Sequence, residues 1–177
     1  MPKRVYYEGA PFPVKDPASF VVMYDGFARD RLTGYYHQAP VPGSNGEAFA
    51  ALDNHYSRDA SNAFYSWLEP GVPPVSKTVR LADARPASVV VLESLYATDS
   101  ARVYYKGKLV TTNAATFRVL QIGYAVSSDA VYYNGEVVPG ADPATFAMLE
   151  TPSDSADSHD AKTSYLQGRK TGAANRD

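Results

Sequence analysis

The chain has 177 residues, a net charge of −2 at neutral pH and no cysteine. This length suits one sizeable hydrophobic core. The small net charge gives no electrostatic reason to expect nucleic acid, and the lack of cysteine excludes disulfides, thiol catalysis and thiolate-bound metals. The sequence has neither the roughly 20-residue apolar run of a membrane helix nor an apolar signal core at its start. As given, it is expected to be cytoplasmic; a mature form trimmed of a leader would belong to the periplasm or envelope.

A pattern of paired aromatic residues recurs along the chain. The second member of each pair falls at Tyr7, Tyr36, Tyr65, Tyr105 and Tyr133. A second apolar marker follows each pair, at Phe20, Phe49, Val89, Phe117 and Phe146. Both markers keep a spacing of 28 or 29 residues, with one shared interval of 40. Two independent markers with the same period and the same interruption predict a tandem repeat.

Each repeat reads as a β-hairpin followed by a short helix, most clearly over residues 129–149. Asn134-Gly135 suits a tight hairpin turn after a Val-Tyr-Tyr strand. Asp142 is placed to cap a helix that begins at Pro143 and buries Phe146. A further aromatic strand ending in Asp or Ser precedes the later hairpins, at residues 27–30, 56–59, 96–99 and 124–127.

The expected fold is therefore α+β, a β-rich tandem repeat. Five units of β-hairpin or meander plus a short helix stack into a single domain, because no unit has enough apolar surface to fold alone. The units lie near residues 3–23, 27–52, 56–92, 96–120 and 124–149. Strand alternation predicts that one tyrosine of each pair packs inward while its neighbour points out.

The repeat resembles the DKNYY family of bacteria over about residues 3–150. The resemblance rests on the pattern YAxD-xxx-VYY-xG-xxV-xxADPxTFxxL, best seen over residues 96–120 and 124–149. The segment from Asp99 to Tyr105 keeps the Asp and both tyrosines of the signature but not the Lys-Asn. The family is largely uncharacterised, so the resemblance supplies no catalytic residue.

Two segments depart from the repeat. In the third unit, residues 68–79 (LEPGVPPVSKTV) are inserted directly after Trp67, and the prolines favour a stiff surface loop. Loops on rigid scaffolds often carry recognition, so the loop is also a candidate binding element. Residues 151–177 are polar, with Tyr165 and Leu166 as their only large apolar side chains. This tail is expected to be disordered and its removal harmless to stability.

Sites for chemistry are sparse. His37, His55 and His159 stand apart from one another in the sequence, in none of the common zinc-binding spacings. The recurring acids Asp30, Asp59 and Asp99 suit turns, whereas a catalytic group normally occurs once. No nucleophile–base pair, phosphate loop or dinucleotide fingerprint is present. The sequence therefore predicts neither an enzyme nor a metal or cofactor site.

Two main functions from different classes remain open, with an enzyme that has an unrecognised site as a third, disfavoured alternative. The first is a non-catalytic protein-binding module, of which an immunity- or inhibitor-like partner of another bacterial protein is one version. The candidate contact residues are Trp67, Leu68, Val72, Pro73 and Pro74, since tryptophan is frequent at interface hot spots. The second is a glycan- or envelope-binding module that uses outward tyrosines. A row of exposed tyrosines would favour the glycan, and an apolar patch around Trp67 would favour the protein partner.

Overall fold

The computed structural model describes residues 4–7, 9–24 and 26–173, and this part of the chain is almost entirely β-structure. Strands make up 41% of the described residues and form six small antiparallel sheets, one with two strands and five with four. The chain folds as two compact units, Met1–Val91 and Leu92–Asp177, where the sequence suggested one domain. Within the described residues, no helix is long and apolar enough to cross a membrane.

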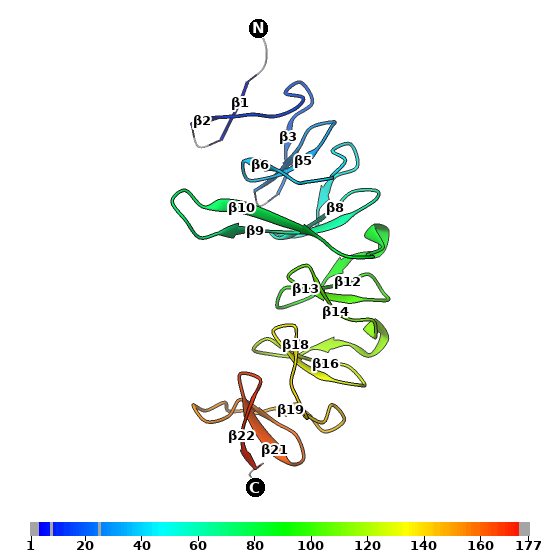
Figure 1. Cartoon of the computed structure of the whole chain (residues 1–177), viewed down its shortest axis with the longest axis vertical. Helices are drawn as coiled ribbons and strands as arrows, with labels where there is room; N and C mark the ends of the chain where they lie inside the picture. Colours follow the sequence, from blue (N-terminus) through cyan, green and yellow to red (C-terminus); the bar gives the residue numbers. More distant parts are fainter. Residues whose placement is uncertain (1–3, 8, 25, 174–177) are drawn as a thin grey trace. The chain divides into compact units, whose positions relative to one another are not determined.

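The first unit holds three consecutive β-meanders (Figure 1). Their strands are β1 (Val5–Tyr7) and β2 (Ala10–Phe12); β3 (Val21–Val22), β4 (Phe27–Arg29), β5 (Gly34–Tyr36) and β6 (Ala39–Pro40); and β7 (Ala50–Ala51), β8 (Tyr56–Arg58), β9 (Ala63–Glu69) and β10 (Val75–Arg80). A single 3₁₀ turn, η1 (Pro86–Ser88), and the short strand β11 (Val90–Val91) complete it. The third meander contains the longest strands.

The second unit repeats the same meander. Its strands are β12 (Tyr96–Thr98), β13 (Val103–Tyr105) and β14 (Lys108–Thr111); β15 (Arg118–Val119), β16 (Tyr124–Val126), β17 (Val131–Tyr133) and β18 (Glu136–Val137); and β19 (Ala147–Met148), β20 (Ser158–His159), β21 (Thr163–Leu166) and β22 (Arg169–Ala173). The 3₁₀ turn η2 (Ala114–Thr116) precedes β15.

The predicted α+β fold with five short helices was wrong. The segment from Asp142 to Phe146 forms one turn, in which the Asp142 carboxylate accepts hydrogen bonds from the Ala144 N–H and the Thr145 hydroxyl. Such side-chain bonds satisfy the backbone locally and compete with helix formation. The next strand begins at Ala147, so no room remains for a helix. Asp16 and Asn45 accept the equivalent backbone bond in their own turns, whereas Asn113 makes no side-chain cap bond.

The apolar residues of these turns nevertheless contribute to the cores. Phe49 and Val89 are buried, while Phe20, Phe117 and Phe146 are partly buried and pack against buried clusters. In the second unit, for example, the Phe117 ring lies 5.3 Å from that of Tyr96 and 5.7 Å from that of Tyr132. These rings belong to successive meanders, so the turn residue joins one sheet to the next.

The tyrosine pairs do not alternate simply between core and solvent. Both Tyr35 and Tyr36 are buried, and Tyr104 is buried beside a half-buried Tyr105. A sheet between two others has both faces covered, which removes the solvent side that the alternation argument assumed.

The predicted disordered tail was also wrong, because residues 158–173 form three strands of a sixth sheet. Asp160 and Tyr165 keep the five-residue spacing of Asp30 and Tyr35. Tyr165 is fully buried in a cluster with Tyr124, Val131 and Val138. The free energy gained by burying the Tyr165 ring in this cluster exceeds the cost of ordering the polar segment around it.

A buried aspartate organises four of the sheets, at Asp30, Asp59, Asp99 and Asp160. In the second meander, one oxygen of Asp30 accepts the N–H groups of Leu32 and Thr33 within its own turn, at 2.8 and 2.9 Å. The other oxygen accepts the Tyr35 hydroxyl at 2.6 Å and the Asp16 N–H, from the preceding meander, at 2.8 Å. One carboxylate thus closes a turn, fixes a tyrosine and ties two sheets together.

The last sheet repeats this four-bond arrangement. Asp160 accepts the N–H groups of Lys162, Thr163 and Asp142 and the hydroxyl of Tyr165, at 2.7–3.0 Å. Burial alone would raise the pKa of Asp160, but these hydrogen bonds outweigh it and lower the pKa to about 2. Burial and the bond to Asp160 raise the pKa of Tyr165 to about 12.

We expect Tyr165→Phe to lower the free energy of unfolding by about 1.5–3 kcal/mol, because it removes a hydrogen bond to a buried carboxylate and keeps the ring. Urea melts measure this change. Tyr133→Phe is the matched control, since this half-buried tyrosine has no hydroxyl hydrogen bond within the described residues. Equal losses for the two variants would contradict the role given to the Tyr165 hydroxyl.

Removal of residues 157–177 should lower the Tm by about 10 °C or more, because the cluster around Tyr124 loses a buried ring. Thermal melts followed by circular dichroism test this. A shorter removal, of residues 174–177 only, is the control. An unchanged Tm after the longer removal would show that the sixth sheet contributes no stability.

Stability should also fall at acid pH. A carboxylate with a pKa of about 2 in the folded chain and about 3.9 when unfolded stabilises fully above about pH 4. That contribution is lost as the pH falls from about 4 to about 2. Asp160→Asn should flatten this part of the stability profile, whereas Asp154→Asn, at an exposed position, should leave it unchanged. The free energy of unfolding, measured at several pH values, distinguishes the two outcomes.

Candidate functional site

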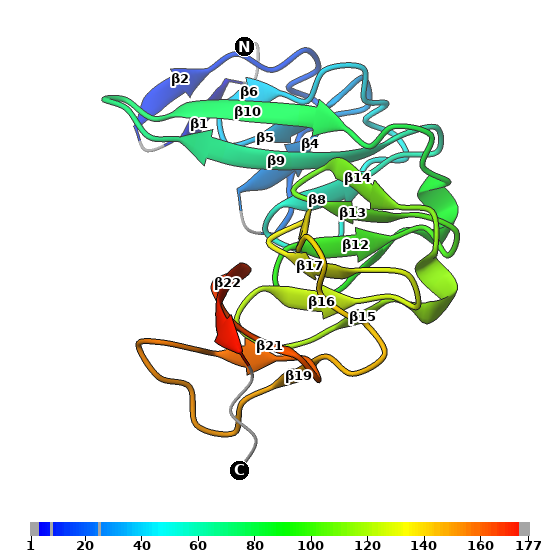
Figure 2. The ribbon, with the colours of Figure 1, turned by 60° about the horizontal axis from the view of Figure 1, so that its bottom comes forward.

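The third meander carries the most prominent departure from the repeat, a long hairpin made by β9 and β10 (Figure 2). The ladder pairs Phe64 with Arg80 at its base and Glu69 with Val75 at its outer end. In the fifth meander, the equivalent strands are joined by the two residues Asn134 and Gly135. The inserted residues are therefore mostly strand, and the predicted surface loop shrinks to residues 70–74. The prolines lie in this tip, where they break no ladder bond.

The hairpin exposes apolar side chains. Val72 at the tip is fully exposed, and Leu68, Val75 and Val79 are exposed by 37%, 49% and 37%. Lys77 and Glu69 add an exposed ion pair with a nitrogen–oxygen distance of 3.3 Å. A solvent-exposed strand pair with this many apolar residues presents a candidate contact surface.

A cleft of about 280 Å³ lies beside the hairpin. Leu68, Pro73, Pro74 and Ser76 line it from the hairpin, and Tyr7, His37 and Gln38 line it from the first two meanders. The Tyr7 hydroxyl lies 2.9 Å from Nδ1 of His37, so hydrogen-bonded polar side chains line the cleft together with the apolar residues of the hairpin. This mixture of apolar walls and a few polar groups suits a peptide or protein side chain.

The predicted contact residues do not all face the same way. Leu68, Pro73 and Pro74 line the cleft, and Val72 projects at the tip. Trp67 does not line the cleft; it is half-buried and stacks on Tyr65 with ring centroids 5.8 Å apart. Neighbouring residues of a strand point to opposite faces, which accounts for the separation of Trp67 from Leu68.

Sequence reasoning missed Tyr7, His37 and Gln38 as neighbours of the hairpin. His37 was recognised only as a turn residue, and it does occupy a turn, with a positive φ of 49°. Its ring lies close to Gly26, where a Cβ would come within 2.8 Å of Nε2. The proximity of this turn to a hairpin more than 30 residues away depends on sheet stacking, which no local motif reports.

The tyrosines do not form an exposed row. Of the tyrosines in the described residues, only Tyr6 and Tyr24 are exposed, at 56% and 62%. Nine others are buried and hold the sheets together. In the residues that the structure covers, no group of three or more histidine or acidic side chains is placed to hold a metal ion.

The meander with its turn and paired aromatic residues recurs along the described chain, and one family model covers most of the same residues. The model of the DKNYY family matches residues 2–169. The chain belongs to the DKNYY family. Searches of curated proteins and of solved structures gave no match for this DKNYY protein. The family match extends past residue 150, where the sequence resemblance ends, and covers the strands β19, β20 and β21 of the sixth sheet.

Proposed function

We propose that this DKNYY protein is a non-catalytic protein-binding module, with the β9–β10 hairpin as its contact element. The observation that supports this is the exposed apolar hairpin beside a cleft, on a scaffold whose other meanders close without such an extension. Stability does not require the hairpin, because two residues suffice at the equivalent position of the fifth meander.

The proposed surface comprises the tip and both faces of the hairpin. Leu68, Pro73 and Pro74 contact the partner beside the cleft, Val72 contacts it at the tip, and Trp67 lies on the other face. An immunity- or inhibitor-like role, in which the hairpin occupies a groove of another protein, is the specific version that we put forward. A protruding antiparallel ribbon suits this role because its backbone is already ordered, so little entropy is lost on binding.

The aspartates and tyrosines are proposed to be structural. The Asp30 and Asp160 carboxylates already accept four hydrogen bonds each, which occupies the lone pairs that acid–base chemistry would need. The buried tyrosines also leave no stacking row for a sugar, so the glycan-binding alternative has no observation in its favour.

The central test replaces residues 66–78 by Asn-Gly, the turn of the fifth meander. We expect this variant to keep the wild-type Tm within a few degrees and to lose its partner, because Tyr65 and Val79 would then pair as Tyr133 and Glu136 do. Pull-down from the native host with mass spectrometry identifies proteins held by the wild type and absent with the variant. The affinity of the purified candidate is then measured directly.

Point variants keep the test independent of the large deletion. Leu68→Ser with Val72→Ser should weaken binding by about 2 kcal/mol or more, the usual hot-spot threshold. Val137→Ser, an exposed valine near the equivalent turn of the fifth meander, is the matched control and should bind normally. Normal binding by both the double variant and the Asn-Gly variant would place the interface elsewhere.

A further inference from the structure

The first meander is only half of the repeat. β1 and β2 correspond to β5 and β6, since Tyr6 pairs with Pro11 as Tyr35 pairs with Pro40. In the next meander, β4 pairs with the other edge of β5. Within the described residues, β1 has no strand on that edge. An open strand edge is a ready template for another strand.

Tyr6 is far more exposed than the equivalent residues of the other meanders. In the other five meanders, the residue at the position of Tyr6 is at most 2% exposed. These residues are Tyr35, Phe64, Tyr104, Tyr132 and Tyr165. Tyr6 is 56% exposed. Tyr35 owes its environment partly to Asp30, at the end of the neighbouring strand β4, which accepts its hydroxyl. Among the strands that the structure describes, none pairs with β1 on this side of Tyr6.

The backbone of Tyr6 is also directed at the open edge. Between β4 and β5, the Asp30 N–H donates to the Thr33 carbonyl and the His37 N–H donates to the Gly26 carbonyl. Hydrogen-bonded pairs alternate along an antiparallel ladder, so Tyr35 is bonded to β4 through both its N–H and its C=O. The equivalent groups of Tyr6 point away from β2.

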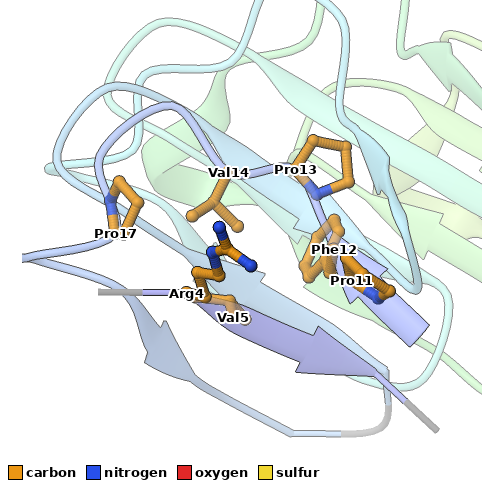
Figure 3. Close-up of a pocket in the computed structure, with 7 residues that line it drawn as sticks. All are labelled: Arg4, Val5, Pro11, Phe12, Pro13, Val14 and Pro17. Atoms are coloured by element: carbon orange, nitrogen blue, oxygen red, sulfur yellow. The ribbon is translucent and has the colours of Figure 1, made fainter. Parts of the chain in front are cut away.

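A hollow beside β1 offers space for the end of an added strand. It has a volume of about 490 Å³ and is lined by Arg4, Val5, Pro11, Phe12, Pro13, Val14 and Pro17 (Figure 3). Pro17 corresponds to Gly46, where a Cβ would collide with the Asp30 carbonyl oxygen. The turn that follows the aspartate fills this space in the second meander, and the same space is open beside Pro17.

Arg4 places a positive charge beside the open edge, which favours a bound segment with an acidic residue. It stands two residues before Tyr6, the position that Arg102 holds before Tyr104. Arg102 forms an ion pair with Asp99, at the end of β12, with a nitrogen–oxygen distance of 3.4 Å. Arg4 is therefore placed to pair with an acidic residue at the end of a strand bound to β1.

The five complete meanders define the rest of the pattern. The residue opposite the Tyr6 position is small and buried every time, as Ala28, Ser57, Ala97, Ala125 and Ser158. The Ser57 hydroxyl has no hydrogen-bond partner in the described structure, so the position selects for small volume. In four of the five, an aromatic residue precedes the small one, and an aspartate follows two positions later in all but one, where Ser127 stands.

We propose that the open edge of β1 binds an extended protein segment of the form aromatic–small–any–acidic as an added antiparallel strand. Its small residue lies opposite Tyr6, its aromatic residue lies opposite Tyr7, and its acidic residue pairs with Arg4 beside the hollow. Strand addition of this kind takes affinity from the ladder and specificity from the alternate side chains. The site adjoins the cleft of the hairpin at Tyr7. Its test uses a synthetic peptide and therefore does not depend on the native partner of the hairpin.

The probe is a fluorescently labelled synthetic peptide with the sequence of residues 90–100, VVLESLYATDS, titrated against the full chain and followed by anisotropy. Backbone amide shifts map the contact, and we expect them at Val5, Tyr6 and Tyr7. A peptide with an N-methyl group on its Ala97 should bind about tenfold more weakly, because it loses one ladder bond. An N-methyl group on its Ser100, beyond the strand, is the matched control.

A charge exchange tests the Arg4 pairing. Arg4→Asp should weaken binding of the wild-type peptide by about tenfold, and a peptide with Asp99→Arg should restore it. Tyr6→Ser should weaken binding, whereas Tyr24→Ser, at an equally exposed tyrosine, should not. Absence of binding, binding that ignores the N-methyl group, or amide shifts away from β1 would overturn the proposal. A dimer with exchange protection at Tyr6 would overturn it too, since a second copy would then occupy the edge.

Discussion

The structure depends on a carboxylate that is buried and fully hydrogen-bonded. A buried carboxylate is costly unless its oxygens are satisfied, and Asp30 and Asp160 are each satisfied by two N–H groups of a turn, one tyrosine hydroxyl and one N–H of the preceding meander. Since the donors come from two meanders, one meander alone would leave the charge without part of its shell. The charged aspartate can therefore be buried only where two short sheets stack, so the burial of the charge and the stacking of the sheets depend on each other.

In meanders where the aspartate or the tyrosine of this arrangement is replaced, other groups form hydrogen bonds between the neighbouring sheets. Phe64 has no hydroxyl, yet Asp59 still accepts the Asn45 N–H of the preceding meander at 2.7 Å. In the last meander, Asp157 stands where Tyr124 stands in the meander before it, and its carboxylate accepts the Tyr124 hydroxyl and the Gln167 N–H. The glycines of the hairpin turns complete the contact, because a Cβ at Gly135 or Gly168 would collide with a tyrosine of the preceding sheet. Turn residues thus serve both local geometry and sheet stacking.

Much of this could be predicted from the sequence, and the failures have physical causes. The period, the Asn134-Gly135 turn and the turn role of the recurring aspartates follow from local chemistry. The helices were mispredicted because a residue that caps a helix caps a single turn equally well, and only the distance to the next strand, which is set by stacking, decides between them. The tail was mispredicted because its average polarity hid a complete aspartate–tyrosine pair at Asp160 and Tyr165. The cleft could not be predicted, since it joins Tyr7 and His37 to Leu68 through neighbouring sheets.

The β9–β10 hairpin has a consequence for how such a scaffold changes over time. Its two strands lengthen outward while their inner ends, at Phe64 and Arg80, keep the pairing found in the shorter meanders. Length at this position is thus uncoupled from the register of the stack, and each of the other hairpin turns occupies an equivalent position. A repeat built this way can acquire a new projecting ribbon from any meander without rebuilding its core, which makes the turns, rather than the sheets, the natural places for new binding segments to arise or to be grafted.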